Sequence, residues 1–343
     1  MLPILVIKFG TASITDSNGD IDENTIGVVA SQVSVLKSKF RIILVSSGAV
    51  GAGKKLIHNY KGELSQKKAA AAIGNPILIS IYAKHFEPFG IPVAQSLCER
   101  SHFANRAQFL RLKQTYETLW ESGAIPIANE NDVVSDVELK FSDNDELATL
   151  LAAGFGAETL MFSTSVGGLL DKNGNIVNQI EQIDDSIWQM VDRSKSSLGL
   201  GGMLSKLQFA ERANQLGIKV IIFAARQNNS ILEALNGQIG SLFQPQKSTR
   251  TLKQKWMSTG SLIAGKVILD SGAENAIRGR KSLLAVGVLR FEGTFEVGEM
   301  IELISESGVC IAIARAEVSS SVLADNLKTK KFEVAHADEI VVL

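Results

Sequence analysis

Short apolar runs alternate with longer stretches of helical character over the first 243 residues of the chain. The continuous apolar runs are residues 4–7, 42–45, 125–128, 160–162 and 220–224. Strands of this kind belong in a sheet that is covered on both faces, since neither face meets water. The helical stretches between them are residues 25–39, 67–86, 104–122, 145–154 and 203–216. This alternation predicts an α/β protein, a three-layer sandwich with a mostly parallel sheet that binds ligands at the carboxyl ends of its strands.

The pattern changes after residue 243. Residues 244–250 read Gln-Pro-Gln-Lys-Ser-Thr-Arg, a polar segment with a proline that is typical of a linker. Short β-like segments follow at residues 265–269, 283–289, 300–303, 309–314 and 339–342. Because glycines separate these segments, they predict a small β-rich domain. We therefore expect one domain at 1–246 and a second at 255–343, with a linker at about 244–254.

The charge balance argues against a nucleic acid as the main partner. The chain has 35 Lys and Arg residues and 36 Asp and Glu residues, for a formal net charge of −1. Proteins that bind a phosphate backbone normally present a basic surface. A membrane span is not expected either, because no uninterrupted apolar run approaches the ~18 residues that it needs.

The cysteines and the N-terminus suggest a cytoplasmic protein. Cys98 and Cys310 are far apart and belong to no metal-like pattern, which suits free thiols in a reducing compartment. The N-terminal segment is apolar, but it lacks a basic start and is interrupted at Lys8 and Gly10. We interpret it as a first strand and not as a signal peptide.

Two glycine-containing turns follow predicted strands near the N-terminus. At the first, Lys8 can place its charge beside a phosphate, and Gly10 allows close approach of the backbone. The second, Val-Ser-Ser-Gly-Ala-Val-Gly-Ala-Gly at 45–53, offers backbone N–H groups and hydroxyls to an anion. Its glycine spacing matches neither the phosphate loop nor the dinucleotide-binding motif. Taken alone, each turn also fits a purely structural role.

Two dense polar clusters are harder to explain structurally. Asn-Glu-Asn-Asp at 129–132 follows a predicted strand and should lie at the carboxyl edge of the sheet. Ser-Asp-Asn-Asp at 142–145 precedes a predicted helix, which Asp143 or Asn144 can cap. Capping explains one residue but not both clusters. We interpret them as groups that bind a substrate amine or orient a lysine.

A glycine-rich loop opens the helix predicted at 203–216. Residues 199–206 read Gly-Leu-Gly-Gly-Met-Leu-Ser-Lys. Backbone amides of such a loop can approach phosphate oxygens, and the helix N-terminus adds a favourable dipole. Lys206 would lie about one turn into the helix, within reach of a γ-phosphate.

Taken together and in this order, the motifs resemble those of the amino acid kinase family. The resemblance rests on Lys8-Phe-Gly, on Ser46-Ser47-Gly48-Ala49, on the two polar clusters and on the loop ending at Lys206. It covers roughly residues 4–243, and the remainder resembles a PUA domain. The pair of polar clusters is similar to that of family members that phosphorylate the side-chain carboxylate of glutamate.

The resemblance implies a reaction, a set of partners and a set of site residues. The expected reaction transfers the γ-phosphoryl group of ATP to L-glutamate and gives γ-glutamyl phosphate, the first step of proline biosynthesis. Mg²⁺ is expected to bridge phosphate oxygens, with no protein side chain assigned as a metal ligand. A homo-oligomer, dimer or tetramer, and feedback inhibition by proline are also implied. The implied catalytic residues are Lys8, Lys206 and Asp145. The residues implied to bind glutamate are Ser47, Asp132, Asp143 and Asn144. The residues implied to bind ATP are Lys8, Gly10, Gly48, Thr164, Ser165, Gly201, Gly202, Met203 and Lys206.

The expected chemistry needs no general base. A γ-carboxylate is already ionised at neutral pH, so it is ready to attack phosphorus. It needs alignment and relief of the repulsion between two anions, which lysines, a metal ion and helix N-termini supply. The four histidines therefore receive no role.

The sequence departs from the family pattern at three positions, which we assign to the nucleotide side. Ser165 stands where the family usually has Asp, Leu200 where it has Thr, and Asn75 where it has Gln. Each lost buried hydrogen bond would weaken ATP binding by ~1–3 kcal/mol. The hypothesis is an active kinase with weaker or less selective nucleotide binding.

Three alternatives stay open at this point. The first is a kinase of the same fold with a different acid substrate. The second is an RNA-binding protein with a degenerate kinase domain, because PUA-like domains occur in RNA-modifying enzymes. The third is a catalytically silent regulatory relative.

Overall fold

The computed structural model describes the chain except for residues 105, 135–142, 192–201 and 248–262. The chain forms two compact units, one of residues 1–99 with 113–249 and one of residues 100–112 with 250–343. The linker predicted at about 244–254 falls partly on residues outside this description, so the domain boundaries stay a prediction.

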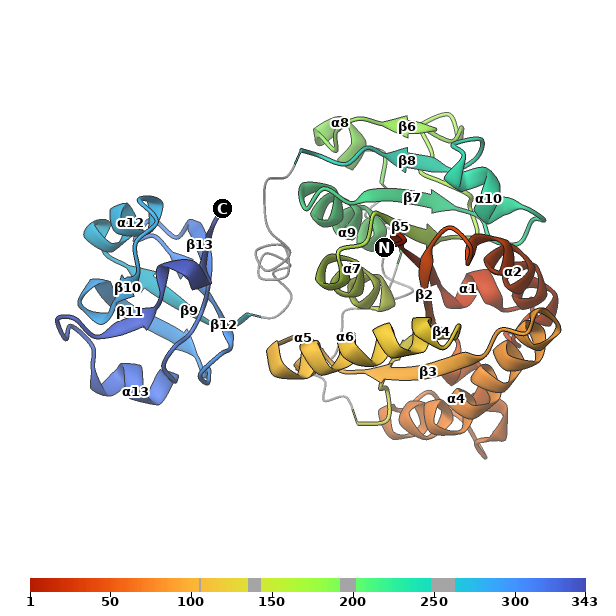
Figure 1. Ribbon diagram of the computed structural model, residues 1–343, viewed down its shortest axis with the longest axis horizontal. Coiled ribbons are helices and arrows are strands. Elements are labelled where there is room, and N and C mark those ends of the chain that lie inside the picture. Colours follow the sequence, from red (N-terminus) through yellow and green to blue (C-terminus); the bar gives the residue numbers. More distant parts are fainter. Residues whose placement is uncertain (105, 135–142, 192–201, 248–262) are drawn as a thin grey trace. The chain divides into compact units, whose positions relative to one another are not determined.

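The first unit is built on one eight-stranded sheet. Its strands are stacked from β3 to β6 in the order β3-β4-β2-β1-β5-β7-β8-β6 (Figure 1). The pairs are parallel except for β7 with β8. The bounds are β1 Ile4–Phe9, β2 Arg41–Ser46, β3 Val93–Cys98, β4 Ile125–Glu130, β5 Thr159–Ser163, β6 Gln179–Ile180, β7 Lys219–Phe223 and β8 Ser241–Phe243. The predicted mostly parallel sheet is confirmed.

Helices of this part of the chain agree with the predicted stretches to within a few residues at each end. The bounds are α1 Thr11–Ile14, α2 Glu23–Leu36, α3 Ala49–Gly53, η1 Lys54–Leu56, α4 Leu64–Phe86, η2 Glu87–Phe89, α5 Arg100–Ala104, α6 Arg106–Glu121, α7 Asn144–Phe155, α8 Asp185–Trp188, α9 Met203–Gln215 and α10 Ser230–Leu235. The stretch predicted at 104–122 corresponds to α6, and α5 and the start of α6 belong to the second unit.

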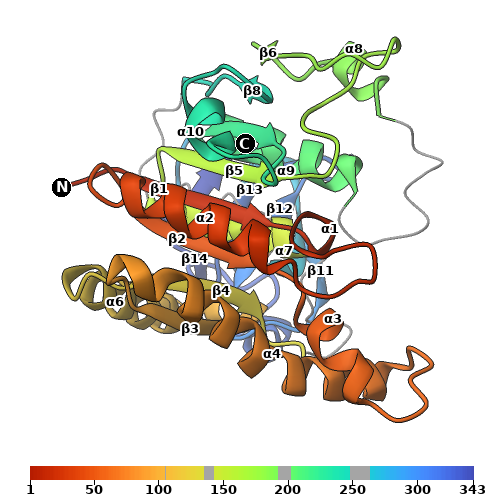
Figure 2. The same cartoon turned by 90° about the vertical axis from the view of Figure 1, so that its right-hand side faces the viewer.

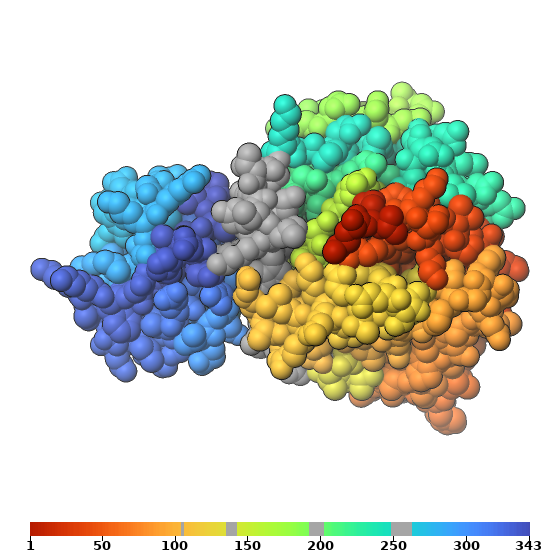
Figure 3. Space-filling model, viewed as in Figure 1, coloured from red at the N-terminus to blue at the C-terminus, as the bar shows by residue number. Residues whose placement is uncertain are grey.

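The core fixes which way Lys8 points. All six residues of the central strand β1 are buried, and Figure 3 shows the N-terminal segment (red) packed among neighbouring segments. Leu5, Ile7 and Phe9 join the hydrophobic core formed with α2 and α4, which run along the sheet (Figure 2). Because side chains alternate along a strand, Lys8 projects from the opposite face, where α7 packs on β1.

Two glycines allow helices α3 and α4 to cross with their backbones touching. A Cβ on Gly74 would lie 1.8 Å from the carbonyl oxygen of Ala49, and one on Gly53 would lie 2.0 Å from that of Ala70. No side chain fits at either position without movement of the backbone. This crossing fixes α3, which begins directly after Ser47 and Gly48.

The second unit contains a five-stranded sheet of order β11-β9-β12-β13-β15 and a two-stranded sheet of β10 and β14. The bounds are β9 Ile263–Leu269, α12 Ser271–Arg278, β10 Leu283–Leu284, η4 Ala285–Gly287, β11 Val288–Gly293, β12 Met300–Ile304, β13 Cys310–Arg315, α13 Ser320–Asp325, β14 Glu333–Ala335, η5 Ala337–Glu339 and β15 Ile340–Val342. The unit encloses its own apolar core. The predicted β-rich domain is confirmed, although the run at 283–289 is two strands separated by a helical turn.

Among the described residues, no helix combines the length and the apolar character that crossing a membrane requires.

Candidate active site

Asp145 joins the two lysines that the sequence singled out. Lys8 Nζ lies 2.6 Å from Asp145 Oδ1, and Lys206 Nζ lies 3.1 Å from Asp145 Oδ2. All three side chains are buried, and that of Asp145 is completely so. The three groups carry a combined formal charge of +1. An additional anion placed beside them would therefore meet a net attraction.

Local structure explains how these three side chains meet. Asp145 lies in the first turn of α7, whose N-cap is Asp143. Lys206 lies one turn into α9, whose N-cap is Gly202. Because α7 and α9 pack against each other, the two helix starts lie side by side above β1.

Asp143 connects the lysine pair to the adjoining cavity. Its carboxylate accepts hydrogen bonds from the backbone N–H groups of Asp145 at 2.8 Å and Glu146 at 3.2 Å, and another from the Ser205 hydroxyl. Burial raises the pKa of Asp143, and the negative charge of Asp145 raises it further. Of the two predicted caps, Asp143 is the one that serves.

Burial also changes the acidity of Lys206. Desolvation lowers the pKa of this ammonium group, and the attraction of Asp145 offsets part of that change. The nearby positive charge of Lys8 lowers the pKa further. Lys206 is therefore a weaker base than an exposed lysine.

The predicted glutamate residues line a cavity of about 480 Å³. Ser47, Asp132, Asp143 and Asn144 all contribute to its wall. Its remaining lining residues are Thr11, Gly48, Ala49, Val50, Gly51, Lys54, Tyr60, Asn129 and Glu130. The residues predicted for glutamate are thus brought together.

A chain of amide groups fixes the orientation of Asn144. Asn75 Oδ1 accepts from Asn129 Nδ2 at 3.2 Å, and Asn129 Oδ1 accepts from Asn144 Nδ2 at 2.9 Å. Asn144 Nδ2 also donates to the Ser47 hydroxyl at 2.9 Å. The two ends of the relay, Asn75 Nδ2 and Asn144 Oδ1, have no hydrogen-bond partner within the described residues. Asn144 Oδ1 is therefore a buried acceptor without a hydrogen-bond partner among the described residues.

Asn75 contacts the wall of this cavity through one hydrogen bond. We grouped it with the nucleotide side, and its side chain bonds Asn129 of β4, which lines the cavity with the predicted glutamate residues. The sequence gave only the residue type of Asn75, and its contact with Asn129 is seen only in the fold. Its assignment to the nucleotide side stays a prediction.

Residues predicted for ATP lie at the loops beyond β1, β2 and β5 and at the start of α9. A Cβ on Gly10 would lie 3.5 Å from Lys8 Nζ, so glycine keeps the approach to that ammonium group open. Gly48 has φ +101°, a left-handed conformation that favours glycine. Thr164 and Ser165 directly follow β5, and Gly202 and Met203 cap and begin α9. Gly201 and the neighbouring Leu200 lie outside the described residues.

Sequence reasoning missed several residues of this region. Thr11, Lys54 and Tyr60 line the cavity, and Ser205 bonds Asp143. The position of Ser205 directly before Lys206, on the same helix turn, was the available signal. For Lys54 and Tyr60 there was none, since their loops reach the cavity only through the fold.

The described residues include no group of three or more His, Cys, Asp or Glu side chains suited to hold a metal ion. Mg²⁺ commonly keeps several waters and takes the rest of its ligands from one or two carboxylates and substrate phosphates.

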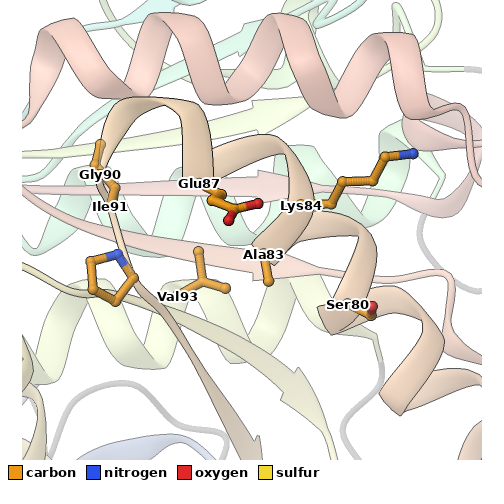
Figure 4. A pocket seen from close by; sticks show the side chains of 8 residues that line it. Ser80, Ala83, Lys84, Glu87, Gly90, Ile91 and Val93 are labelled. Carbon is orange, nitrogen blue, oxygen red and sulfur yellow. The ribbon is translucent and has the colours of Figure 1, made fainter.

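A second cavity, of about 510 Å³, lies at the end of α4 (Figure 4). Lys84 and Glu87 are among the side chains around it, and it shares no lining residue with the first cavity. No predicted site residue lines it, so we assign it no role.

Comparison with known proteins yields two family matches. The sequence model of the amino acid kinase family matches residues 3–224, and that of the PUA domain matches residues 265–337.

Curated relatives match over nearly their whole length. The chain is 34% identical to the glutamate 5-kinase of Geobacter sulfurreducens, covering 98% of this chain and 95% of that protein. It is 37% identical to the glutamate 5-kinase of Gloeobacter violaceus, covering 96% and 93%. For the glutamate 5-kinase of Thermotoga maritima the identity is 35%, covering 94% and 91%.

Among solved structures, carbamate kinase from Giardia lamblia bound to AMP-PNP is similar with a TM-score of 0.51. The two chains are 17% identical over 71% of this chain and 99% of that one. At this identity the likeness shows the fold alone.

Proposed function

The chain belongs to the amino acid kinase family, and because its full-length relatives are glutamate 5-kinases we propose that it phosphorylates L-glutamate with ATP. A γ-carboxylate oxygen attacks the γ-phosphorus, the bond from that phosphorus to the bridging oxygen of ADP breaks, and γ-glutamyl phosphate forms. This is the first step of proline biosynthesis. The observation that carries the proposal is the Lys8–Asp145–Lys206 arrangement beside a cavity lined by Asp143 and Asn144.

Lys8 and Lys206 are proposed to stabilise the transferring phosphoryl group. Their positive charges stabilise the negative charge that develops on the phosphoryl oxygens in the transition state. Asp145 holds both ammonium groups in place, so no side chain has to reorganise during the reaction. Asp145 is thus a positioning residue, and the two lysines are the catalytic ones.

Glutamate binding is assigned to Ser47, Asp132, Asp143 and Asn144. Asn144 lines the cavity, and its unpaired Oδ1 is an acceptor suited to an ammonium hydrogen. The carboxylates of Asp132 and Asp143 add negative charge on the same cavity wall. Both features support binding of the α-ammonium group of an amino acid, and not of a simple dicarboxylate.

Nucleotide binding is assigned to the loops and helix start around the two lysines. Gly10, Gly48, Gly202 and Met203 would offer backbone N–H groups to phosphate oxygens, as Gly201 is also predicted to do. Thr164 and Ser165 are proposed to contact the nucleoside. Mg²⁺ would enter with ATP, and it supplies positive charge to the phosphate oxygens.

Further proposals rest on the relatives and on the substrates. We infer a homo-oligomer, dimer or tetramer, and feedback inhibition by proline from membership among glutamate 5-kinases. A cytoplasmic location is supported by the need for ATP and by the free thiols of Cys98 and Cys310. We propose that residues 1–246 form the kinase domain and that residues 255–343 form an accessory PUA domain.

The test measures ADP release from the purified chain with MgATP, with and without L-glutamate. Hydroxylamine is added to trap an acyl phosphate as the hydroxamate. We expect glutamate-dependent turnover that yields the hydroxamate and is lost in Lys206→Ala. If turnover occurs only with another acid, that acid and not glutamate is the substrate. If no acid supports turnover, the kinase domain is degenerate.

A further inference from the structure

The charges of glutamate raise a problem that the assigned residues do not solve. In addition to its ammonium group and the γ-carboxylate that reacts, glutamate carries an α-carboxylate. Glu130, Asp132 and Asp143 line the cavity, and each would repel a second carboxylate. Lys8 and Lys206 both form ion pairs with Asp145, and the proposed function already assigns their remaining attraction to phosphate. The α-carboxylate therefore needs another positive partner.

Lys54 is the basic residue on the cavity wall as the structure describes it. It begins the helical turn η1, directly after α3, and its backbone N–H donates to the carbonyl oxygen of Val50. Its ammonium group lies against Gly19, since a Cβ at that glycine would be 2.8 Å from Lys54 Nζ. A side chain at position 19 would displace the ammonium group, so the glycine leaves room for it.

The charge of Lys54 is not matched by a carboxylate of the described residues. Across the described ranges of the chain, its side chain forms no ion pair and no hydrogen bond, although it is partly buried. Its neighbour Lys55 instead pairs with Asp20 and is 55% exposed. A partly buried ammonium group without a counter-ion favours an anionic ligand, because the ligand restores interactions lost with water.

We propose that Lys54 binds the α-carboxylate of glutamate and thereby selects α-amino acids over substrates that lack this group. The inference rests on the proposed function and deepens it. The unpaired acceptor of Asn144 takes the ammonium group, Lys54 takes the α-carboxylate, and the γ-carboxylate is left for the phosphoryl group. The three charged groups of the substrate are thus matched by three different parts of the site.

The test compares Lys54→Met with Lys55→Met, which removes the same charge one residue away and outside the cavity wall. In Lys54→Met we expect the KM for glutamate to rise about 10- to 100-fold, as for the loss of a hydrogen bond to a charged group. The kcat should stay within threefold, and the KM for ATP should not change. Lys55→Met should behave as the parent chain, and Lys54→Arg should recover most of the affinity.

Two inhibitors separate a direct contact from a general loss of structure. Glutarate keeps both carboxylates of glutamate, and 4-aminobutyrate lacks the α-carboxylate. If Lys54 contacts that group, Lys54→Met weakens inhibition by glutarate and leaves inhibition by 4-aminobutyrate unchanged. Equal weakening of both inhibitors, or an unchanged KM for glutamate, would overturn the proposal.

The same assay separates this inference from the proposed function. If the parent chain does not turn over glutamate at all, the proposed function fails. If the parent is active and Lys54→Met matches Lys55→Met, only the assignment of Lys54 fails. Thermal unfolding of each variant shows whether a change in KM reflects the site or the fold.

Discussion

Lys8 and Lys206 form ion pairs with opposite oxygens of one buried carboxylate, that of Asp145, at 2.6 and 3.1 Å. One lysine comes from the first strand of the sheet and the other from helix α9, far along the chain. Asp145 sits between them in the first turn of α7. The shared carboxylate holds two like charges close together. The three groups leave a net charge of +1 between the end of β1 and the starts of α7 and α9.

Replacing the shared carboxylate should harm both stability and catalysis. In Asp145→Asn the two buried ammonium groups repel each other without a counter-charge. We expect the free energy of unfolding to fall by about 3–5 kcal/mol. The kcat should fall at least ~100-fold, because the positive groups are no longer held in place. Urea denaturation and initial rates measure the two effects.

Asp20→Asn is the matched control for this change, because Asp20 also pairs with a lysine but at an exposed position. Exposed ion pairs contribute about 0–1 kcal/mol, so both stability and kcat should remain close to those of the parent. An Asp145→Asn chain that is as stable and as active as this control would show that the carboxylate does not organise the lysines.

The lowered pKa of Lys206 predicts an alkaline limit to activity. Burial is its largest cause, and Lys8 adds to it while Asp145 and Asp143 oppose it. In the folded chain Lys206 loses its proton at a pH below the ordinary value of 10.5. The kcat/KM for MgATP should therefore decline on the alkaline side before an ordinary lysine would titrate. A pH–rate profile measures this decline.

Lys206→Arg provides the comparison, since a guanidinium group stays protonated throughout the accessible range. The variant should be slower, but its alkaline decline should move to higher pH. The sign for stability is opposite: between the folded pKa and 10.5 the unfolded chain holds more protons, so this group's contribution to stability rises with pH. If kcat/KM declines at the same alkaline pH in parent and variant, the decline belongs to another titrating group.

The close crossing of α3 and α4 predicts an effect of Gly74→Ala on the glutamate site. The added Cβ would lie 1.8 Å from the carbonyl oxygen of Ala49, so the helices must separate. Overpacking of this kind typically costs about 1–3 kcal/mol of stability. Because α3 follows Ser47 and Gly48 of the cavity, the KM for glutamate should rise more than the KM for ATP.

Ala72→Ser is the control for this helix, since it adds one atom at an exposed position of α4. It should leave unfolding and both KM values unchanged. Equal stability of Gly74→Ala and Ala72→Ser in urea denaturation would show that the crossing tolerates a side chain, contrary to the geometry described above.

The amide relay predicts a role for Asn75 in glutamate affinity. Asn75→Ala removes the acceptor of Asn129 Nδ2 and leaves a buried donor unpaired. Such a loss costs about 1–3 kcal/mol, and rotation of the Asn129 amide can recover part of it. That rotation disturbs Asn144, so the KM for glutamate should rise about fivefold to tenfold. Steady-state kinetics with glutamate and ATP varied separately measure it.

Ser80→Ala, on the exposed side of the same helix, is the control for Asn75→Ala and should leave both KM values unchanged. A rise confined to the KM for ATP would return Asn75 to the nucleotide side, where sequence reasoning had placed it.

The sequence patterns that succeeded are those with a single physical explanation. Continuous apolar runs predicted β1, β2, β4, β5 and β7, because a strand buried on both faces has no other pattern. Strand β3 was missed because most of its residues are only partly buried, and β6 and β8 because they have two and three residues.

At the site, the lysine pair and Asp145 were predicted because they belong to motifs that resemble the amino acid kinase family, while each motif alone was weak. Lys54 was not, and for Asn75 only the residue type was noted. Lys54 reaches the cavity through a helical turn, and Asn75 bonds a residue that lines it. Neither periodicity nor motif spacing reports such contacts. For such residues the tertiary fold is the necessary information.

The last prediction concerns the nucleotide side, where Ser165 stands in place of the carboxylate usual in the family. Ser165 directly follows β5 and is exposed, so it is free to accept a larger side chain. A carboxylate there would accept hydrogen bonds from nucleoside hydroxyl or amino groups, each contributing about 0.5–1.5 kcal/mol. We expect Ser165→Asp to bind ATP about 3- to 10-fold more tightly, with the KM for glutamate unchanged.

Calorimetric titration with a non-hydrolysable ATP analogue measures the change, and Ser165→Ala should show no gain. If the parent chain already binds as tightly as Ser165→Asp, its nucleotide site is not weakened, and the hypothesis of poor ATP binding has to be abandoned.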